Sequence, residues 1–372
     1  MLAKPFKLIL VYVLTVINIT FLIAPIIASI APFTDFTRNG IVIDYNIYQK
    51  TILIVNSAIF AVSFVMLCYI FFDFLFGFSH RSSLKNCKRY DKLKGYEFLN
   101  QIFLEAKEKF NSPNVKLYIK NSDEINAYAV ASMYQSSIVL TRGLIDHYLV
   151  LSADPKEFLL SIRSIIGHEM SHLINRDFLP TFFVICNQKA TNLVSNIVHK
   201  IFYFKINLFQ KIPYIGLLYA NAVYYLFSLM NFILTIFNKY IVLVIYNFLN
   251  KFASRSIEYR CDLQSAQAFG GDHMATALEK LGKNGYFTIF STHPNTALRI
   301  KNVRIIKPVL EKISPSFSNK LSNYLAMMTL VTICLYFAKQ ANIDQLVREL
   351  LRNHEYIYRK LSYLWHLFKQ IY

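Results

Sequence analysis

The 372-residue chain departs from the composition of ordinary soluble domains, because 55% of its residues are hydrophobic and 16% are aromatic. Its formal net charge of +18 suits nucleic acid, anionic lipid or the cytoplasmic loops of a membrane protein. The apolar composition favours the two membrane interpretations. The five cysteines lie far apart with no C-x-x-C pair, so they indicate neither a disulfide framework nor a thiolate zinc site.

Two long apolar runs, residues 8–30 and 52–72, predict transmembrane helices near the N-terminus. The first run is longer than the roughly 7 to 15 residues of a signal peptide, so we expect it to be retained. Few basic residues lie between the runs, but several follow the second: Arg81, Lys85, Lys88, Arg89, Lys92 and Lys94. By the positive-inside rule, residues from about 78 onward are expected in the cytoplasm.

The segment 78–178 is expected to be soluble. A helical pattern covers residues 96–110, and short alternating runs at 115–119, 126–131 and 138–141 predict a small β-sheet. Asp154, Pro155 and Glu157 have the order of an N-cap, a first-turn proline and a capping-box partner. They predict the start of a helix that runs to about residue 174.

Apolar sequence returns in the segment 179–250, where residues 179–203 and 216–237 are the candidate spans. The first of these carries several polar side chains, so it either packs against other helices or lines a polar cavity. A second soluble segment, 251–320, follows. In the last segment, 321–372, a run at 321–337 is barely long enough to span, and the amphipathic tail lies either on the membrane surface or against the protein. Together with an N-terminal segment, 1–77, which holds the first two spans, these segments make five parts. The whole chain is expected to have four or five membrane helices.

His168, Glu169 and His172 form an H-E-x-x-H pattern on the predicted helix. Histidines four residues apart share a helix face, so both can bind one zinc ion. The adjacent glutamate can take a proton from a zinc-activated water and pass it to the leaving amine. The pattern therefore indicates peptide hydrolysis. It fixes only three positions and can occur by chance, so the surrounding sequence has to show whether it marks a zinc site.

Glu258 is the candidate third ligand, and Asp262 follows it four residues later on the same helix face. Three protein ligands leave one zinc position for water, as catalytic zinc requires. Asp262 would accept a hydrogen bond from the outer ring nitrogen of a zinc-bound histidine. Two acids at this spacing also occur on ordinary exposed helix faces.

Four sequence blocks together resemble the HtpX-like membrane zinc metalloproteases, which are integral-membrane gluzincins, with prenyl-protein endopeptidases as larger relatives. The blocks are Asn-Ala-Tyr-Ala at 126–129, Ile-Ile-Gly-His-Glu-Met-Ser-His at 165–172, Ser-Arg-Ser-Ile-Glu-Tyr-Arg-Cys-Asp at 254–262 and Ser-Thr-His-Pro at 291–294, followed by Arg299. They occur in the family's order, and the resemblance extends from the first predicted span to about residue 300. One departure is Cys261, where the family commonly has alanine.

The resemblance implies a role for each matching residue: His168, His172 and Glu258 as ligands of one Zn²⁺ per chain, Glu169 as general base and Asp262 as the carboxylate behind the ligands. It also implies that Asn126, Ala127 and Tyr128 bind the substrate backbone as an edge strand, and that His293 steadies the oxyanion. Without the resemblance, Asn126 and His293 would both be interpreted as turn residues.

The sequence thus predicts a mainly α protein of integral membrane helices with a cytoplasmic gluzincin domain that contains a small β-sheet. The resemblance implies an endopeptidase of a bacterial inner membrane that cleaves membrane-associated or misfolded proteins. A prenyl-protein-type endopeptidase and a non-catalytic metal-binding membrane scaffold are the alternatives. The expected partners are protein substrates and the lipid bilayer. Nucleic acid is not expected, because the basic residues cluster near membrane ends without a recognition motif.

Overall fold

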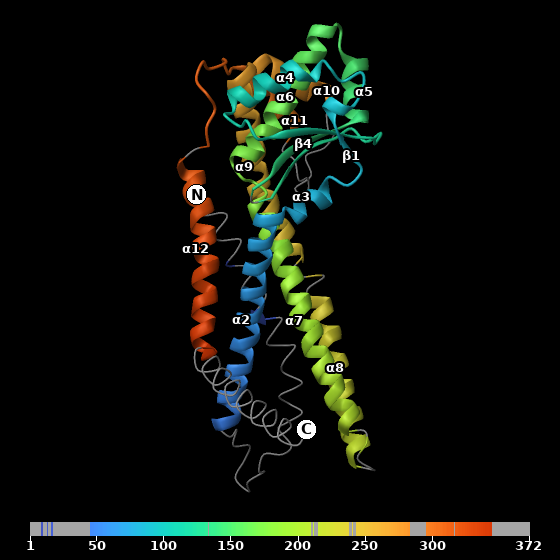
Figure 1. Ribbon diagram of the computed structural model, residues 1–372, viewed down its shortest axis with the longest axis vertical. Coiled ribbons are helices and arrows are strands. Elements are labelled where there is room, and N and C mark those ends of the chain that lie inside the picture. The colour runs from blue at the N-terminus through green and yellow to red at the C-terminus, as the bar shows by residue number, and fades with distance from the viewer. Residues whose placement is uncertain are drawn as a thin grey trace, which may run out of the picture. The chain divides into compact units, whose positions relative to one another are not determined.

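A computed structural model of the chain shows a mainly helical fold with a small mixed sheet, as the sequence predicts (Figure 1). The described residues are 9, 13, 16–17, 45–132, 134–209, 211, 215–237, 240, 243–282, 295–315 and 317–343. The predicted span at 8–30 falls almost entirely outside these residues, and so does the C-terminal tail beyond residue 343.

The chain divides into two compact units. One comprises chiefly Cys68–Cys186 and Ile236–Met327 and is called the sheet unit here. The other, the helical unit, comprises Ile9–Leu67, Asn187–Thr235 and Met328–Tyr372.

The sheet unit contains a four-stranded sheet with the strand order β1-β2-β4-β3. The strands are β1 (Cys87–Arg89), β2 (Lys116–Lys120), β3 (Ala127–Ala131) and β4 (Ser136–Thr141). The central pair β2 and β4 is parallel, and the outer pairs are antiparallel. β3 is therefore an edge strand. The three predicted strands are confirmed, whereas β1 is too short and polar to have been predicted.

The sheet unit also contains the helices α3 (Phe78–Ser83), α4 (Leu99–Lys109), α5 (Arg142–Leu151), α6 (Pro155–Ile174), α9 (Leu243–Phe269), α10 (Gly271–Lys280) and α11 (Thr296–Arg304) (Figure 1). α6 packs against β3 and β4, and α9 and α10 pack against α6. α6 lies in the middle of the core, with Ile162, Ile166 and Met170 fully buried. It starts as predicted, since the Asp154 carboxylate accepts a hydrogen bond from the Glu157 amide at 2.7 Å and Pro155 is its first residue.

Gly167 sets how closely α6 approaches α9. A Cβ at this position would lie 2.8 Å from both the Phe269 ring and the Ser265 hydroxyl. The same contact is held by a hydrogen bond, because the Ser265 hydroxyl donates to the Ser164 carbonyl at 2.6 Å. The helix that carries H-E-x-x-H is thereby fixed against the helix that carries Glu258 and Asp262.

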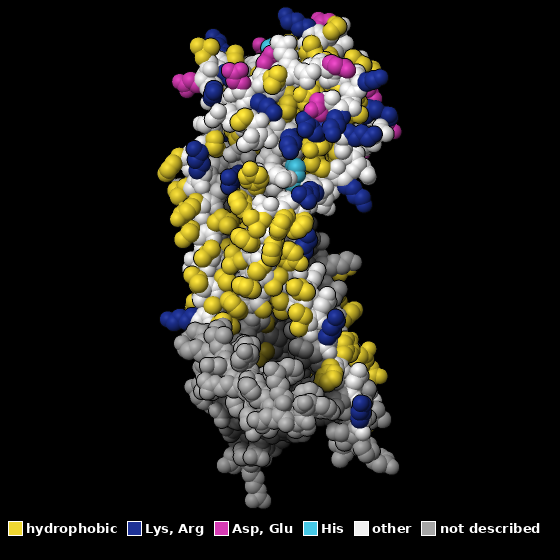
Figure 2. Space-filling model, in the orientation of Figure 1, with side chains coloured by type: hydrophobic (Ala, Val, Ile, Leu, Met, Phe, Trp, Pro, Cys, Tyr) yellow, Lys and Arg dark blue, Asp and Glu magenta, His cyan; other side chains and the backbone are white. Residues whose placement is uncertain are grey.

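The remaining helices are long: α2 (Tyr45–Phe76), α7 (Leu179–Phe209), α8 (Ile215–Phe237) and α12 (Phe317–Gln340). Leu53–Phe76 and Phe317–Gln340 are each long and apolar enough to cross a membrane. Large apolar side chains on these two helices are exposed, including Phe64, Phe71 and Leu335. In Figure 2, hydrophobic side chains gather over the helices, whereas Lys, Arg, Asp and Glu gather over the sheet unit. Soluble proteins rarely expose so much contiguous apolar surface.

Two more of the predicted crossings, residues 179–203 and 216–237, form the helices α7 and α8, and their place in a membrane stays a prediction. α12 is longer than the predicted run at 321–337, because its polar first turns are included in the helix. Asn319 in those turns donates a hydrogen bond to the Asn175 side chain at 2.7 Å. A tertiary contact therefore extends this helix beyond its apolar residues.

Candidate metal centre

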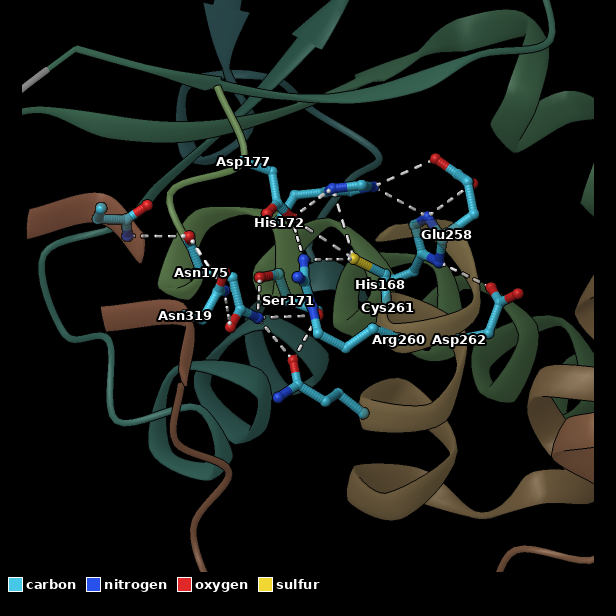
Figure 3. Close-up of polar contacts among 12 residues, drawn as sticks. His168, Ser171, His172, Asn175, Asp177, Glu258, Arg260, Cys261, Asp262 and Asn319 are labelled. Atoms are coloured by element: carbon cyan, nitrogen blue, oxygen red, sulfur yellow. Dashed lines mark hydrogen bonds and ion pairs between the residues drawn. The ribbon is translucent and has the colours of Figure 1, made fainter. Parts of the chain in front are cut away.

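The structure brings together the three residues predicted as metal ligands. His168 and His172 lie on one face of α6, and Glu258 faces them from α9 (Figure 3). The two Nε2 atoms are 3.2 Å apart. The Glu258 carboxylate lies 3.6 Å from Nε2 of His168 and 3.7 Å from Nε2 of His172.

These distances can be compared with what a metal ion requires. Zinc bonds to nitrogen and oxygen of about 2.0–2.2 Å in a tetrahedral arrangement put neighbouring donor atoms about 3.3–3.6 Å apart. The three measured distances are within a few tenths of an ångström of that range. Two imidazole nitrogens and one carboxylate are also a donor set that suits catalytic zinc. The residues present therefore fit a zinc ion.

The outer nitrogen of His168 is held by a buried ion pair. His168 Nδ1 lies 2.9 Å from the Asp262 carboxylate, which accepts two further hydrogen bonds from Arg299 at 2.6 and 2.7 Å. Burial would raise the pKa of Asp262, but the hydrogen bonds from Arg299 and His168 outweigh burial and lower it. An ionised Asp262 accepts a hydrogen bond from the Nδ1–H of His168, which leaves the Nε2 lone pair of His168 pointing at the cluster.

The outer nitrogen of His172 meets a second carboxylate, Asp177, at 3.1 Å. Arg260 pairs with Asp177 in turn, and the Cys261 sulfur lies 3.4 Å from the same ring nitrogen (Figure 3). Burial would raise the pKa of Asp177, but His172 and Arg260 outweigh burial and lower it. Burial raises the pKa of the Cys261 thiol, so it stays protonated at neutral pH.

Local backbone geometry brings Asp177 to this position. α6 ends at Ile174, and Arg176 adopts a left-handed conformation with φ of 52°. The chain then turns back, so that the Asp177 amide donates to the His172 carbonyl at 3.1 Å. The end of α6 is fixed further by Asn175, whose amide donates to the Ser171 carbonyl and to Gln264, each at 2.8 Å (Figure 3).

The cluster opens onto a groove beside β3. On one side, Ala127, Ala129 and Ala131 line a cavity of about 310 Å³ together with His172, Phe178 and Ile257. On the other side, a cavity of about 320 Å³ is lined by Asn126, Ala127, Leu144, Met274, Leu278 and Arg299. His168, Glu169 and Glu258 line both cavities. Glu169 is buried, with 7% of its surface exposed, so its carboxylate can meet a ligand only through this groove.

The predicted backbone-binding residues lie along the same groove. Asn126 is exposed and lies just before β3, and its backbone N–H donates a hydrogen bond to the Thr141 hydroxyl at 3.0 Å. Ala127 and Tyr128 are the first residues of the strand. The predicted oxyanion residue, His293, lies outside the described residues.

Comparison with known proteins identifies the family of the chain. Residues 96–307, more than half of the chain, match peptidase family M48. The chain belongs to peptidase family M48. Members of this family are zinc peptidases, so the chain is a metalloendopeptidase. The family resemblance inferred from the four sequence blocks is thereby confirmed.

A curated relative of this M48 peptidase is Protease HtpX from Legionella pneumophila. The two are 26% identical over 234 residues, which cover 61% of this chain and 73% of the relative. This similarity agrees with the HtpX-like type of the sequence resemblance.

Sequence reasoning did not identify Asp177 or Arg260 as residues of the site, and it did not predict the pairing of Arg299 with Asp262. Asp177 could have been found as the first acid beyond the predicted end of the H-E-x-x-H helix. Arg260 lies between Glu258 and Asp262 in sequence, but which carboxylate it meets depends on how α6 and α9 pack. Arg299 comes from α11, and no local pattern connects it with α9.

Proposed function

We propose that the chain is a zinc-dependent endopeptidase that holds one Zn²⁺ through His168, His172 and Glu258. The observation that carries the proposal is the spacing of 3.2 to 3.7 Å among the three donor groups. Its support is twofold: both outer ring nitrogens meet ionised carboxylates, and the inner nitrogens face one point. A role as a metal-binding scaffold would not need Glu169 in the groove.

Zinc bound at this site would supply a water of lowered pKa and a polarised peptide carbonyl. The Glu169 carboxylate would take a proton from that water as the water oxygen bonds to the carbonyl carbon, and would deliver the proton to the amine nitrogen as the C–N bond breaks. Asp262 and Asp177 keep the two imidazoles in the tautomer whose Nε2 can bind metal. His293 is proposed to donate a hydrogen bond to the oxyanion, as the family resemblance implies.

The substrate backbone is proposed to bind along β3. Ladder hydrogen bonds join Asn126 to Thr141 and Ser132 to Gln135 across the hairpin. By the alternation of antiparallel pairing, Ala127, Ala129 and Ala131 direct their N–H and C=O groups to the other edge, toward the groove. An extended peptide can therefore add to β3 as a further strand, next to Asn126, Ala127 and Tyr128.

The catalytic unit is proposed to face the cytoplasm of a bacterial cell, and its substrates to be membrane-associated or misfolded proteins. The apolar α2 and the basic residues that follow it support this orientation. His168 and Glu258 share one site, so the chain between them must cross a membrane an even number of times. The segment 179–250, with α7 and α8, is proposed as that membrane hairpin between the two catalytic segments, 78–178 and 251–320.

The test is cleavage of an unfolded model protein by the detergent-purified chain, with and without zinc. Wild type should cut in a zinc-dependent manner, and Glu169→Gln should bind zinc without cutting. Asp272→Asn, which neutralises an exposed acid on α10, is the matched control and should cut like wild type. Stoichiometric zinc with no cleavage by wild type would favour the metal-binding scaffold instead.

A further inference from the structure

At one end of the groove beside β3, the hairpin that follows the strand packs against the C-terminal end of the apolar helix α2. The hairpin that joins β3 to β4 begins directly after Ala131, and its Tyr134 ring packs edge-on against Phe74 with ring centroids 6.2 Å apart. A Cβ at Gly77 would lie 2.8 Å from the Gln135 amide, so the chain leaving α2 touches the hairpin closely. Ser137, in β4, lies 2.7 Å from the buried His80 ring of α3. All these residues belong to the sheet unit.

This end of α2 has the character of a membrane boundary. The apolar stretch Leu53–Phe76 stops here, and its last turns expose large apolar side chains, Phe72, Leu75 and Phe76 among them. Exposed basic residues follow at once, beginning with Arg81 and Lys85. Aromatic side chains and then Lys or Arg are typical of the point where a helix leaves the bilayer on the cytoplasmic side.

The groove also has a direction. Antiparallel pairing is slightly more stable per residue than parallel pairing, so a peptide added to β3 is expected to run opposite to it. Its N-terminal part then lies beside Ala131, in the cavity with Phe178 and Ile257, and its C-terminal part lies beside Asn126. His168 and Glu169 line both cavities, so the bond to be cut lies between these two parts.

We infer that the preferred substrates are membrane proteins cut in the chain that follows a transmembrane segment, with the membrane on the N-terminal side of the cut. A chain leaving the bilayer next to α2 reaches the Ala131 end of the groove first and enters it in the antiparallel direction. This inference rests on the proposed function and adds to it the side of the membrane segment on which the substrate is cut. A segment that precedes a transmembrane helix would have to enter β3 from the Asn126 end or pair in parallel.

The geometry also sets where the cut falls. β3 is five residues long, and at about 3.3 Å per residue the N-terminal part of the substrate must extend about 17 Å to pass it. With the hairpin added, the cut is expected about five to ten residues beyond the end of the substrate's membrane segment. A shorter spacer between the membrane segment and the cut would not let the scissile bond reach the metal centre. A much longer spacer would lower the effective concentration of the scissile bond at the groove.

A single-span substrate that carries the same cleavable segment before and after its span tests the polarity. The segment is one that the purified protein cuts as a free peptide, so cleavage of that peptide reports the proposed function separately. The full chain and the substrate are reconstituted together into vesicles, and each protein inserts in both orientations. Both copies of the segment are then equally often on the same side of the membrane as the catalytic unit. Products are assigned by mass, and Glu169→Gln is the control in which none should form.

The expected result is that the copy after the span is cut at least about tenfold faster, because the membrane holds it at the groove in the productive direction. The bias should be largest with spacers of about five to ten residues. Equal rates, or faster cutting of the copy before the span, would overturn the inference while cleavage of the free peptide leaves the proposed function standing. No cleavage of the free peptide would overturn both.

Discussion

His168 and His172 occupy the same face of α6, but their outer ring nitrogens lie in different surroundings. The carboxylate behind His168 is 1% exposed and receives two hydrogen bonds from Arg299, which itself is 8% exposed. The Arg260 side chain behind His172 is 24% exposed, and Asp177 shares the ring nitrogen with a neutral thiol. One support is a buried, closed ion pair, and the other is partly open to solvent.

We expect the two supports to contribute unequally to zinc affinity. A buried arginine that loses its carboxylate remains as an uncompensated charge, whereas a partly exposed one is stabilised by water. Arg299 also lies 3.4 Å from Glu258, one of the proposed ligands. Loss of the carboxylate behind His168 is therefore expected to affect Glu258 as well, whereas loss of the carboxylate behind His172 is expected to affect His172 alone.

The largest effect is expected from Asp262→Asn. The change leaves Arg299 with Glu258 as its nearest carboxylate, so the guanidinium competes with zinc for that ligand. We expect zinc affinity to fall by about 100-fold, the upper end for residues behind metal ligands. Competition with a chelator of known affinity measures it, and Asp272→Asn is the control for a neutralised acid elsewhere. If zinc affinity falls by less than about threefold, the carboxylate behind His168 is not the stronger of the two supports.

A smaller effect is expected from Asp177→Asn. The asparagine oxygen can still accept from His172 Nδ1, and Arg260 is exposed enough for water to replace the lost carboxylate. Zinc affinity should fall by about tenfold. The same chelator titration decides the order of the two variants. If Asp177→Asn costs as much as Asp262→Asn, solvent exposure does not set the strength of these supports.

The smallest effect is expected from Cys261→Ala. The thiol is neutral and makes only a weak contact with the ring, so zinc affinity should change by less than about threefold. The sulfur is fully buried, and its loss leaves a small void that should lower the free energy of unfolding by about 1 kcal/mol. Zinc titration and urea unfolding of the zinc-bound protein separate the two effects. A tenfold or larger change in affinity would make the sulfur part of the metal site.

Local patterns in the sequence predicted the parts of the site that local chemistry determines. Asp154 and Pro155 start α6 through their own backbone preferences, and the spacing of four residues puts His168 with His172 and Glu258 with Asp262 on shared faces. These features depend on neighbours within one helix, and for that reason they were visible without a structure.

The other parts depend on contacts between elements far apart in sequence or on a chain reversal just after a helix. Arg299 reaches Asp262 from α11, and Asp177 reaches His172 only because the chain reverses at Arg176. The first turns of α12 are polar, and a contact between Asn319 and Asn175 includes them in the helix. Periodicity and composition predict none of these contacts, because they depend on how separate helices pack or, for Asp177, on the backbone turn at Arg176.

The most direct test of the central claim is the zinc content of the purified chain, measured by elemental analysis. Wild type and Glu169→Gln should each hold one zinc per chain, because Glu169 is proposed to act on water and not to bind the metal. His168→Ala, His172→Ala and Glu258→Ala should each retain far less after dialysis against a weak chelator. Full zinc occupancy in any of these three variants would contradict the assignment of the metal centre.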